Sequence, residues 1–323
     1  MSKFYTSVER FGNNILWRGY ENGKSFSRRV KYQPTLFTGV RHDTKYKSLS
    51  SGKYLEPTKM DSMRDAKDYI EQYKDVHGFE IAGSSNYVAQ FIQENYPGEI
   101  KYDPSLINIV SFDIEVDIAT GYPDVNTADK EITSIAYKSS KSSDYHLLGR
   151  KGYDKSKTLL DLDPDNIHFM EFDTEHALLK RFKELWINNY PDIVTGWNVE
   201  YFDIQYLITR MKNLFGEEWV KDLSPWRSIR PTGREFYGKM QNTYEISGVS
   251  IIDYMDCFKK FGYKYGPQES WKLDHIANVV LGEKKLDYSE YGNLNALYEQ
   301  NPQLYLDYNL KDTWLIQRFE DET

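Results

Sequence analysis

Three groups of side chains in this sequence have the residue types and spacing of a centre that cleaves phosphodiesters. Asp113 and Glu115 lie two residues apart within an apolar segment. Asp203 lies further along the chain, and Tyr308 precedes Asp312 by four residues. Acidic residues make up 49 of 323 positions, so one Asp-x-Glu triplet carries little information. The elements that carry these side chains therefore decide whether the groups can act together.

The segment 107–116 is predicted to be a β-strand because it is rich in apolar and β-branched residues. Side chains in a strand alternate between its faces, so Asp113 and Glu115 point one way and the intervening apolar side chains point the other. Two carboxylates side by side on an apolar strand are costly without a cation. The similar triplet 173–175 precedes a helical pattern and is predicted to begin a helix. There, the side chains of Asp, Thr and Glu accept hydrogen bonds from unpaired backbone N–H groups or interact favourably with them.

The other two groups are predicted to lie on helices. Residues four apart share a helical face, so Tyr308 and Asp312 are expected to project together. Asp203 is expected at the start of a helix, where unpaired backbone N–H groups favour anions.

Four converging carboxylates would require cations. Like charges about 4 Å apart repel by roughly 4 kcal/mol per pair at an effective dielectric constant near 20. Oxygen ligands favour Mg²⁺ or Mn²⁺ over zinc, and one cysteine (Cys257) with six histidines shows no cluster at zinc spacing. We therefore expect a centre for two divalent cations. The ordinary pKa of tyrosine, about 10, favours Tyr308 as a group that orients the attacking water.

Each group also has a structural interpretation without a ligand. Asp113 and Glu115 could be an exposed pair on an edge strand, and Asp203 could be a helix cap. Tyr308 and Asp312 could form an ordinary helical face. Each group alone favours this interpretation, whereas the three together favour the metal centre.

Two further polar residues are less informative. Lys285 could contact a phosphate, but a solvated lysine is the stronger expectation. His275 lies in a helical pattern and is expected to be a packing or surface histidine.

Three motifs match, in order and spacing, the exonuclease motifs of family B DNA polymerases. They are Asp113-Ile114-Glu115, Asn198-Val199-Glu200-Tyr201-Phe202-Asp203 and Tyr308-Asn309-Leu310-Lys311-Asp312. Similarity to the T-even-type phage replicative polymerases extends over essentially the whole chain, including the segments 195–198, 248–254 and 272–277. The sequence resembles the N-terminal and exonuclease regions of that family.

The resemblance implies a 3′→5′ proofreading exonuclease that uses two Mg²⁺ (or Mn²⁺) ions. Asp113 would bridge both ions, Glu115 and Asp312 would hold the ion on the side of the nucleophile, and Asp203 would support the other. The residues that would position the terminal nucleotide and the water are Asn198, Phe202 and Tyr308.

The implied fold is α/β and ribonuclease-H-like (DnaQ-like), with a mixed sheet flanked by helices and a smaller α+β domain before it. A length of 323 residues is compatible with two domains. We expect an N-terminal domain at 1–104, with a helix beginning near Ser62, and an exonuclease domain at 105–323. In the second domain, strands are predicted at 132–137 and 193–195 and a helix from Thr174.

The sequence contains neither a Ser-Leu-Tyr-Pro-type nor an Asp-Thr-Asp-type polymerase motif. We therefore expect the palm, fingers and thumb to be absent and no DNA synthesis by this chain alone. It is interpreted as an N-terminal piece, either an engineered truncation or the first product of a split polymerase.

The formal net charge of −8 argues against a broad basic surface for duplex DNA. Segment 221–239 is locally basic, and could follow phosphates or be a solvated loop. The resemblance places at 236–251 a β-hairpin that helps to part primer from template. Its expected tip is Tyr237, Gly238 and Lys239, and the expected DNA contacts of this region are Arg234 and Lys239.

Expected partners are single-stranded DNA and primer-template 3′ ends, with a nucleoside monophosphate as product. A separate polymerase chain, a sliding clamp or a single-strand-binding protein is a further expectation from the resemblance. Two alternatives remain open: an N-terminal module that binds RNA or template, and a docking subunit of a split polymerase. The sequence has no stretch for a membrane helix and no signal-peptide core, and one cysteine excludes an intrachain disulfide. We expect a cytoplasmic protein, in the host cell if it is a phage protein.

Overall fold

The computed structural model describes residues 3–236 and 239–322, and the chain divides into two units, Met1–Leu106 and Ile107–Thr323. The first unit contains two antiparallel sheets, with strand orders β1-β2-β3 and β5-β6-β4-β7. Its elements are β1 (Lys3–Phe11), β2 (Asn14–Glu21), β3 (Lys24–Lys31), β4 (Thr35–Gly39), β5 (Tyr46–Lys47), β6 (Tyr54–Lys59), α1 (Met63–Tyr73), β7 (Ile81–Ala82) and α2 (Tyr87–Asn95).

The first unit has its own core, which includes Trp17, Met63 and Phe91. Helix α1 begins as the sequence predicts, because the Ser62 side chain accepts a hydrogen bond from the Asp65 backbone N–H at 3.1 Å.

The second unit is built on a six-stranded mixed sheet in the order β11-β10-β9-β8-β12-β15. β8 pairs antiparallel with β9 and parallel with β12, so it is a central strand. The strands are β8 (Ile109–Val116), β9 (Ile132–Ser139), β10 (Tyr145–Gly149), β11 (Ile167–Glu171), β12 (Ile193–Gly196) and β15 (Ser250–Asp253), with a separate hairpin of β13 (Ile229–Phe236) and β14 (Lys239–Ile246). The predicted strands at 132–137 and 193–195 are confirmed.

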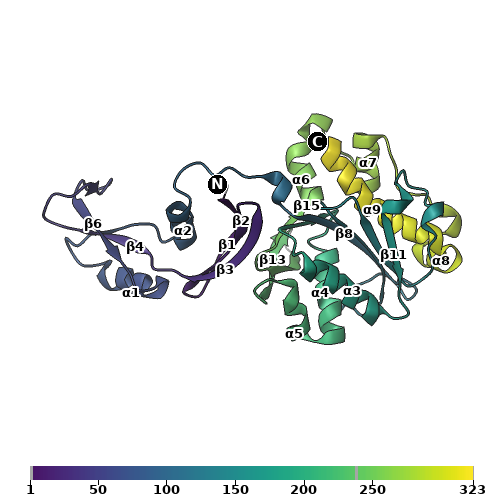
Figure 1. Cartoon of the computed structure of the whole chain (residues 1–323), viewed down its shortest axis with the longest axis horizontal. Helices are drawn as coiled ribbons and strands as arrows, with labels where there is room; N and C mark the ends of the chain where they lie inside the picture. Colours follow the sequence, from purple (N-terminus) through teal and green to yellow (C-terminus); the bar gives the residue numbers. More distant parts are fainter. Residues whose placement is uncertain (1–2, 237–238, 323) are drawn as a thin grey trace. The chain divides into compact units, whose positions relative to one another are not determined.

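Helices cover both faces of this sheet (Figure 1). Helices α3 and α4 pack on one face, where Phe112 and Ile114 of β8 meet Leu178, Phe182 and Trp186 of α3. Helices α6, α7, α8 and α9 pack together in a second core with β9, β10 and β11. The helices are α3 (Glu175–Asn188), α4 (Asp203–Phe215), α5 (Glu217–Val220), α6 (Tyr254–Phe261), α7 (Leu273–Leu281), α8 (Leu294–Gln300) and α9 (Pro302–Glu322).

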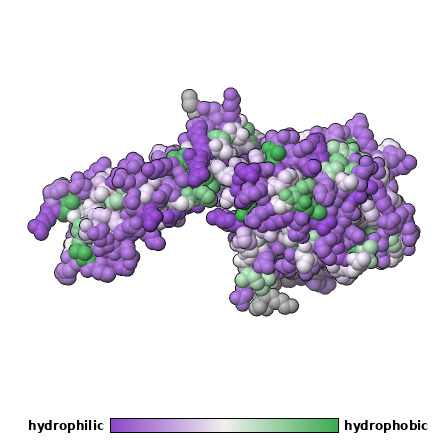
Figure 2. Space-filling view, turned by 90° about the horizontal axis from the view of Figure 1, so that it is seen from below, coloured by the Kyte–Doolittle hydropathy of each residue, from purple (hydrophilic) through white to green (hydrophobic). Residues whose placement is uncertain are grey.

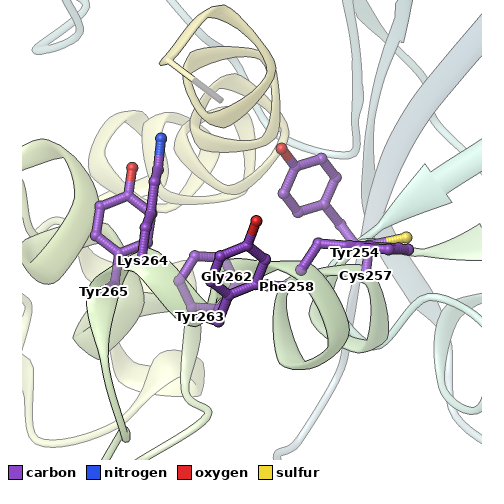
Figure 3. Close-up of a pocket in the computed structure, with 8 residues that line it drawn as sticks. Tyr254, Cys257, Phe258, Gly262, Tyr263, Lys264 and Tyr265 are labelled. Carbon is purple, nitrogen blue, oxygen red and sulfur yellow. The ribbon is translucent and has the colours of Figure 1, made fainter.

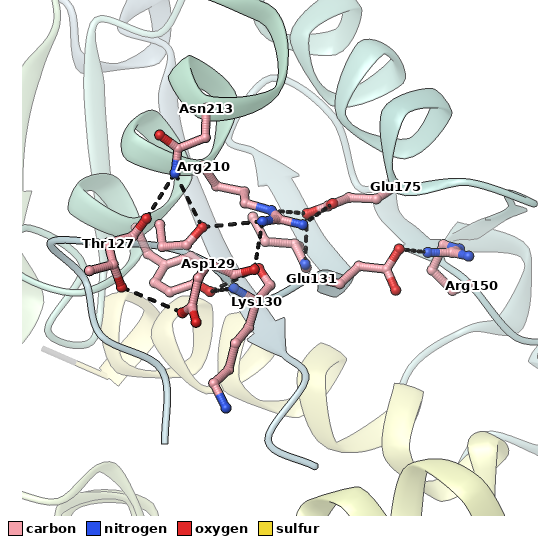
Figure 4. A network of polar contacts seen from close by, with 11 residues as sticks. Thr127, Asp129, Lys130, Glu131, Arg150, Glu175, Arg210 and Asn213 are labelled. Carbon is pink, nitrogen blue, oxygen red and sulfur yellow. Dashed lines mark hydrogen bonds and ion pairs between the residues drawn. The ribbon is translucent and has the colours of Figure 1, made fainter. Parts of the chain in front are cut away.

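A buried ion pair ties the first helical layer to the sheet (Figure 4). The Glu175 carboxylate, 4% exposed, accepts hydrogen bonds from Arg210 Nε at 2.9 Å and Nη2 at 2.7 Å, and from the Ile132 backbone N–H at 2.8 Å. Thr174 caps α3 by accepting the Ala177 backbone N–H at 3.2 Å. The prediction that the triplet 173–175 begins a helix is therefore confirmed.

Hydrophilic residues cover most of the face seen in Figure 2. Within residues 3–236 and 239–322, no helix is both long enough and apolar enough to cross a membrane.

Candidate active site

Strand β8 presents Asp113 and Glu115 on the face opposite to the first core. Its alternate residues Phe112, Ile114 and Val116 are at most 6% exposed and belong to the core with α3 and α4. Asp113 and Glu115 are only partly buried and face the layer that contains α9. The predicted division of this strand into an apolar and an acidic face is confirmed.

Helix α9 carries Tyr308 and Asp312 on one face, as the spacing of four predicts. Both side chains contact Lys285: its ammonium donates a hydrogen bond to Tyr308 Oη at 3.2 Å and forms an ion pair with Asp312 Oδ2. The Lys285 side chain is only 22% exposed. The expectation of a solvated lysine is therefore wrong, because Lys285 is the counter-ion of the acidic pair on α9.

Asn309 joins α9 to β8. Its Nδ2 donates hydrogen bonds to Asp113 Oδ2 at 2.7 Å and to the Asp113 backbone carbonyl at 3.3 Å. Its Oδ1 accepts a hydrogen bond from Ser134 Oγ at 2.9 Å. A buried chain of hydrogen bonds therefore orients Asp113. Asn309 lies inside the third motif, but sequence reasoning did not assign it a role.

Asp203 is the first residue of α4, as predicted, and is 3% exposed. Its Oδ1 accepts the backbone N–H of Ile114 at 3.0 Å. Ile114 lies between Asp113 and Glu115, so this bond fixes Asp203 against the acidic segment of β8. Phe202 precedes it and stacks on Tyr206, with ring centroids 6.0 Å apart.

The turn between β12 and α4 is held by Asp253, a residue that sequence reasoning missed. Its carboxylate, 5% exposed, accepts the backbone N–H groups of Asn198 at 3.1 Å and Glu200 at 3.2 Å. Asn198 has φ of +63°, which is uncommon outside glycine and needs such support. A side chain at Gly196 would come within 2.9 Å of the Phe112 carbonyl, so this turn packs closely on β8. An Asp at the end of an apolar, β-branched segment was the available signal.

Burial and mutual repulsion disfavour ionisation of the four carboxyls. Burial, with the charge of Asp312, raises the pKa of Asp113 to about 8. Burial raises the pKa of Glu115 and of Asp203 well above their ordinary values, and Asp113 adds to both shifts. Burial also raises the pKa of Asp312, although Lys285 opposes the shift. One lysine thus offsets only part of the acidic charge.

The donor set is suited to hard divalent cations, since every candidate ligand is a carboxylate oxygen. Asp312 Oδ1 is buried without a hydrogen-bond partner. In the part of the chain that the structure describes, no three His, Cys, Asp or Glu side chains are already gathered as a metal cage. Asn309 contacts Oδ2 of Asp113 and Lys285 contacts Oδ2 of Asp312, so Oδ1 of Asp312 is an oxygen that a cation could bind without displacing a contact.

The predicted hairpin exists, but it begins earlier than expected. β13 and β14 pair antiparallel from Ile229 with Ile246 to Phe236 with Lys239. The hairpin is thus 229–246 rather than 236–251. Of its expected tip, Tyr237 and Gly238 lie outside the described residues.

Three of the five basic residues in segment 221–239 form ion pairs with acidic residues. Lys221 pairs with Glu218 at 2.5 Å, Arg227 pairs with Glu218 and Asp222, and Arg230 pairs with Glu245 at 2.6 Å. The side chains of the two expected DNA contacts, Arg234 and Lys239, lie outside the description. His275, on α7, meets Gln268 Oε1 through Nε2 at 3.1 Å, as expected of a packing histidine.

Comparison with known proteins gives one consistent picture. The family model described as "DNA polymerase family B, exonuclease domain" matches residues 84–276. The chain is 34% identical to the DNA-directed DNA polymerase of Enterobacteria phage T4 over 99% of its length, and 33% identical to that of Escherichia phage RB69 over 98%. It spans only 37% of each of these phage proteins. The chain is 28% identical to the DNA polymerase catalytic subunit of human herpesvirus 8 over 60% of its own length and 19% of that protein. The chain therefore belongs to DNA polymerase family B, through its exonuclease domain.

Proposed function

We propose that this chain is a 3′→5′ proofreading exonuclease that removes terminal nucleotides from single-stranded DNA or frayed primers. The observation that carries the proposal is that α9 and α4 both bond to the acidic segment of β8: Asn309 donates a hydrogen bond to Asp113 Oδ2, and Asp203 accepts one from the Ile114 backbone N–H. The mixed sheet between two helical layers supports a ribonuclease-H-like fold. Membership of the family favours this reaction over other uses of acidic clusters.

The four carboxylates Asp113, Glu115, Asp203 and Asp312 would hold two divalent cations, Mg²⁺ or Mn²⁺. Such ions, when bound, activate water and stabilise the leaving oxygen of a phosphodiester. Their charge would also replace that of Lys285 at Asp312.

The polar groups around the carboxylates would handle the substrate. Tyr308 would orient the attacking water through its hydroxyl, because burial raises its pKa above the ordinary value and so disfavours a role as base. Lys285, once released from Asp312, would contact a substrate phosphate. Asn198 and Phe202, at the start of α4, would position the terminal nucleotide, and the hairpin residues Arg234 and Lys239 would contact the strand.

We extend the proposal to the organisation of the chain. Residues 1–104 would form the N-terminal domain and 105–323 the exonuclease domain. The product would be a nucleoside monophosphate. A separate polymerase chain, a sliding clamp or a single-strand-binding protein would be partners in replication, and the protein would act in the cytoplasm of the host. Recognition of RNA or template by residues 1–104, and docking to a polymerase chain, are alternative functions.

The test is hydrolysis of 5′-labelled single-stranded DNA in Mg²⁺ or Mn²⁺. The label should appear in a ladder of products shortened one nucleotide at a time from the 3′ end, and EDTA should stop the reaction. Asp113→Ala/Glu115→Ala should lower the rate at least about 1,000-fold, which corresponds to about 4 kcal/mol of transition-state stabilisation.

Asp173→Ala is the matched control, because it removes an exposed carboxylate from the triplet 173–175, which has the same Asp-x-Glu pattern but begins helix α3. Its rate should equal that of the parent. Activity that persists in Asp113→Ala/Glu115→Ala, or that needs no divalent cation, would refute the assignment.

A further inference from the structure

A pocket of about 370 Å³ lies beside α6 and the following 3₁₀ turn, Gly262–Tyr265 (Figure 3). A volume of this order is within the range of small-ligand sites. Its walls are mainly aromatic, with a thiol and an ammonium: Tyr254, Cys257, Phe258, Tyr263, Lys264 and Tyr265. None of the carboxylates of the candidate active site lines it.

Large aromatic side chains around this pocket are exposed. Tyr263 is 85% exposed, Phe261 64% and Trp271 39%. Single exposed apolar residues are normal, but three aromatic ones within eleven residues around one pocket indicate a contact surface.

The same segment is basic although the chain is acidic. Residues 254–272 contain four lysines, Lys259, Lys260, Lys264 and Lys272, against Asp256 and Glu269, so the local net charge is 4 − 2 = +2. The formal net charge of the chain is −8. The ammonium groups of Lys260 and Lys264 lie 5.2 Å from the Phe261 ring and 5.0 Å from the Tyr265 ring. Cations and aromatic faces are therefore interleaved.

We propose that this pocket, with its exposed aromatic rim, is a second binding site for single-stranded DNA. A base would enter the pocket and stack on Tyr263 or Phe261, and the flanking phosphates would contact Lys260 and Lys264. Interleaved aromatic and basic side chains bind single strands because every base has a stacking face and every linkage has a charge. A protein partner would not account for the positive charge as directly. This proposal rests on the proposed function in one respect only, which is that the single strand bound in the pocket is taken to be DNA.

The pocket is connected to the candidate active site through short contacts. Helix α6 begins directly after Asp253, whose carboxylate holds the turn that starts at Asn198. The ring of Trp197 lies 6.4 Å from that of Phe258 in the pocket wall, and its Nε1 donates to the Trp271 carbonyl at 2.9 Å. A strand in the pocket would therefore lie beside the turn that carries the second acidic motif.

Cys257 is a site-specific probe, because it lines the pocket and is the single cysteine of the chain. The Asp113→Ala/Glu115→Ala protein, kept in EDTA, would be alkylated with a maleimide in the presence or absence of dT16. We expect saturating dT16 to slow the reaction at least about fivefold, whereas a 16-base-pair duplex should not, because its bases cannot enter the pocket. Cys257→Ser sets the background of labelling.

Binding of fluorescein-labelled dT16, followed by anisotropy in the same background, tests the contacts one by one. Tyr263→Ala should weaken binding about tenfold through lost stacking. Lys264→Ala should reduce the slope of log K against log salt by about 0.7. The matched controls are Leu159→Ala, which removes a 65% exposed apolar side chain, and Lys180→Ala, which removes an exposed lysine of α3. Both controls should bind dT16 like the parent.

The proposal is overturned if dT16 does not protect Cys257, if duplex protects it equally, or if Tyr263→Ala binds like Leu159→Ala. A pocket that serves a protein partner would give the first of these results. Because these measurements need neither metal nor hydrolysis, they are independent of the proposed function. If dT16 protects Cys257 but the parent chain does not hydrolyse DNA, the pocket is supported and the proposed function is refuted. If the parent chain hydrolyses DNA but dT16 does not protect Cys257, the pocket alone is refuted.

Discussion

Replacement of Asn309 by alanine should weaken both the fold and the candidate site. Asn309 and Ser134 are both fully buried, at 0% exposure, so water cannot replace a lost hydrogen bond. Asn309→Ala removes the 2.7 Å hydrogen bond to Asp113 and leaves the Ser134 hydroxyl unpaired. Each loss is worth about 1–3 kcal/mol. Because the two losses share one side chain and overlap, we expect the free energy of unfolding to fall by about 3 kcal/mol.

Urea unfolding followed by tryptophan fluorescence measures this loss, since six of the seven tryptophans, all except Trp17, lie in the second unit. The double variant Ser134→Ala/Asn309→Ala removes both partners. It should lose about 1 kcal/mol less than the sum of the single variants. The matched control is Asn213→Ala, because the amide of that exposed residue donates to the Thr127 carbonyl at 2.8 Å. It should cost no more than about 0.5 kcal/mol.

A role in positioning Asp113 requires a second measurement. Supporting residues around a metal ligand typically change metal affinity by about 10–100-fold, so Asn309→Ala should weaken Mn²⁺ binding in calorimetric titration by that factor. Asn213→Ala should bind Mn²⁺ like the parent. Two results would refute the reasoning: unfolding of Asn309→Ala at the same urea concentration as Asn213→Ala, or lower stability with unchanged Mn²⁺ affinity. The second would reduce Asn309 to a packing residue.

Three further outcomes are expected. Arg210→Ala leaves the buried Glu175 carboxylate without its counter-ion, so the free energy of unfolding should fall by about 3–5 kcal/mol. Arg230→Ala breaks an exposed ion pair with Glu245 and should cost at most about 1 kcal/mol. Equal losses in urea unfolding would contradict the burial argument. Burial lowers the pKa of His146 below 6.5, so its contribution to stability is present above pH 6.5 and is lost as the pH falls. His146→Gln should flatten the pH dependence of unfolding there by up to about 1.4 kcal/mol per pH unit, and an unchanged slope would refute this. Asp312→Ala should lower the single-turnover rate of hydrolysis more than Tyr308→Phe, because a cation ligand is lost rather than a hydroxyl; equal losses would give the phenol a larger part.

Periodicity was sufficient to predict how the acidic residues are presented. The alternation of β8 places Asp113 and Glu115 away from the apolar core, and the helical repeat places Tyr308 with Asp312. Asp203 could be placed at a helix start for the same reason. These regularities follow from local backbone geometry, so they do not depend on which elements pack against the strand or helix. That the three elements meet was inferred from the motifs, because periodicity does not determine which elements are neighbours in space.

The residues that sequence reasoning missed, or in the case of Lys285 misassigned, act through partners far along the chain. Lys285 reaches Asp312 across 27 positions, and Asn309 reaches Asp113 across 196. Asp253 holds a turn 55 positions earlier. A polar residue of this kind has no periodic signature, since its role depends on which backbone groups the tertiary fold leaves unpaired. The same reason applies to segment 221–239: Glu218 and Glu245, which lie outside it, offset part of its excess of positive charge.

The register of β8 is the condition on which the candidate site depends. A slip of one residue would turn Asp113 and Glu115 into the core and expose Phe112 and Ile114. The β8–β9 pairing shifts register directly after Glu115, at a bulge on β9 beside the acidic pair. The extra residue there, Thr133, donates a hydrogen bond to the Glu115 carbonyl at 3.1 Å.

The two helical layers lock this register from opposite sides of the sheet. Asp203 of α4 binds the backbone of Ile114, and Asn309 of α9 binds the backbone and side chain of Asp113. Each bond would be lost if the strand slipped, since a different backbone group or side chain would then face each helix. Two of the residues inside the acidic motifs thus also hold the strand that carries the first motif. The fold and the candidate site are therefore specified by the same contacts.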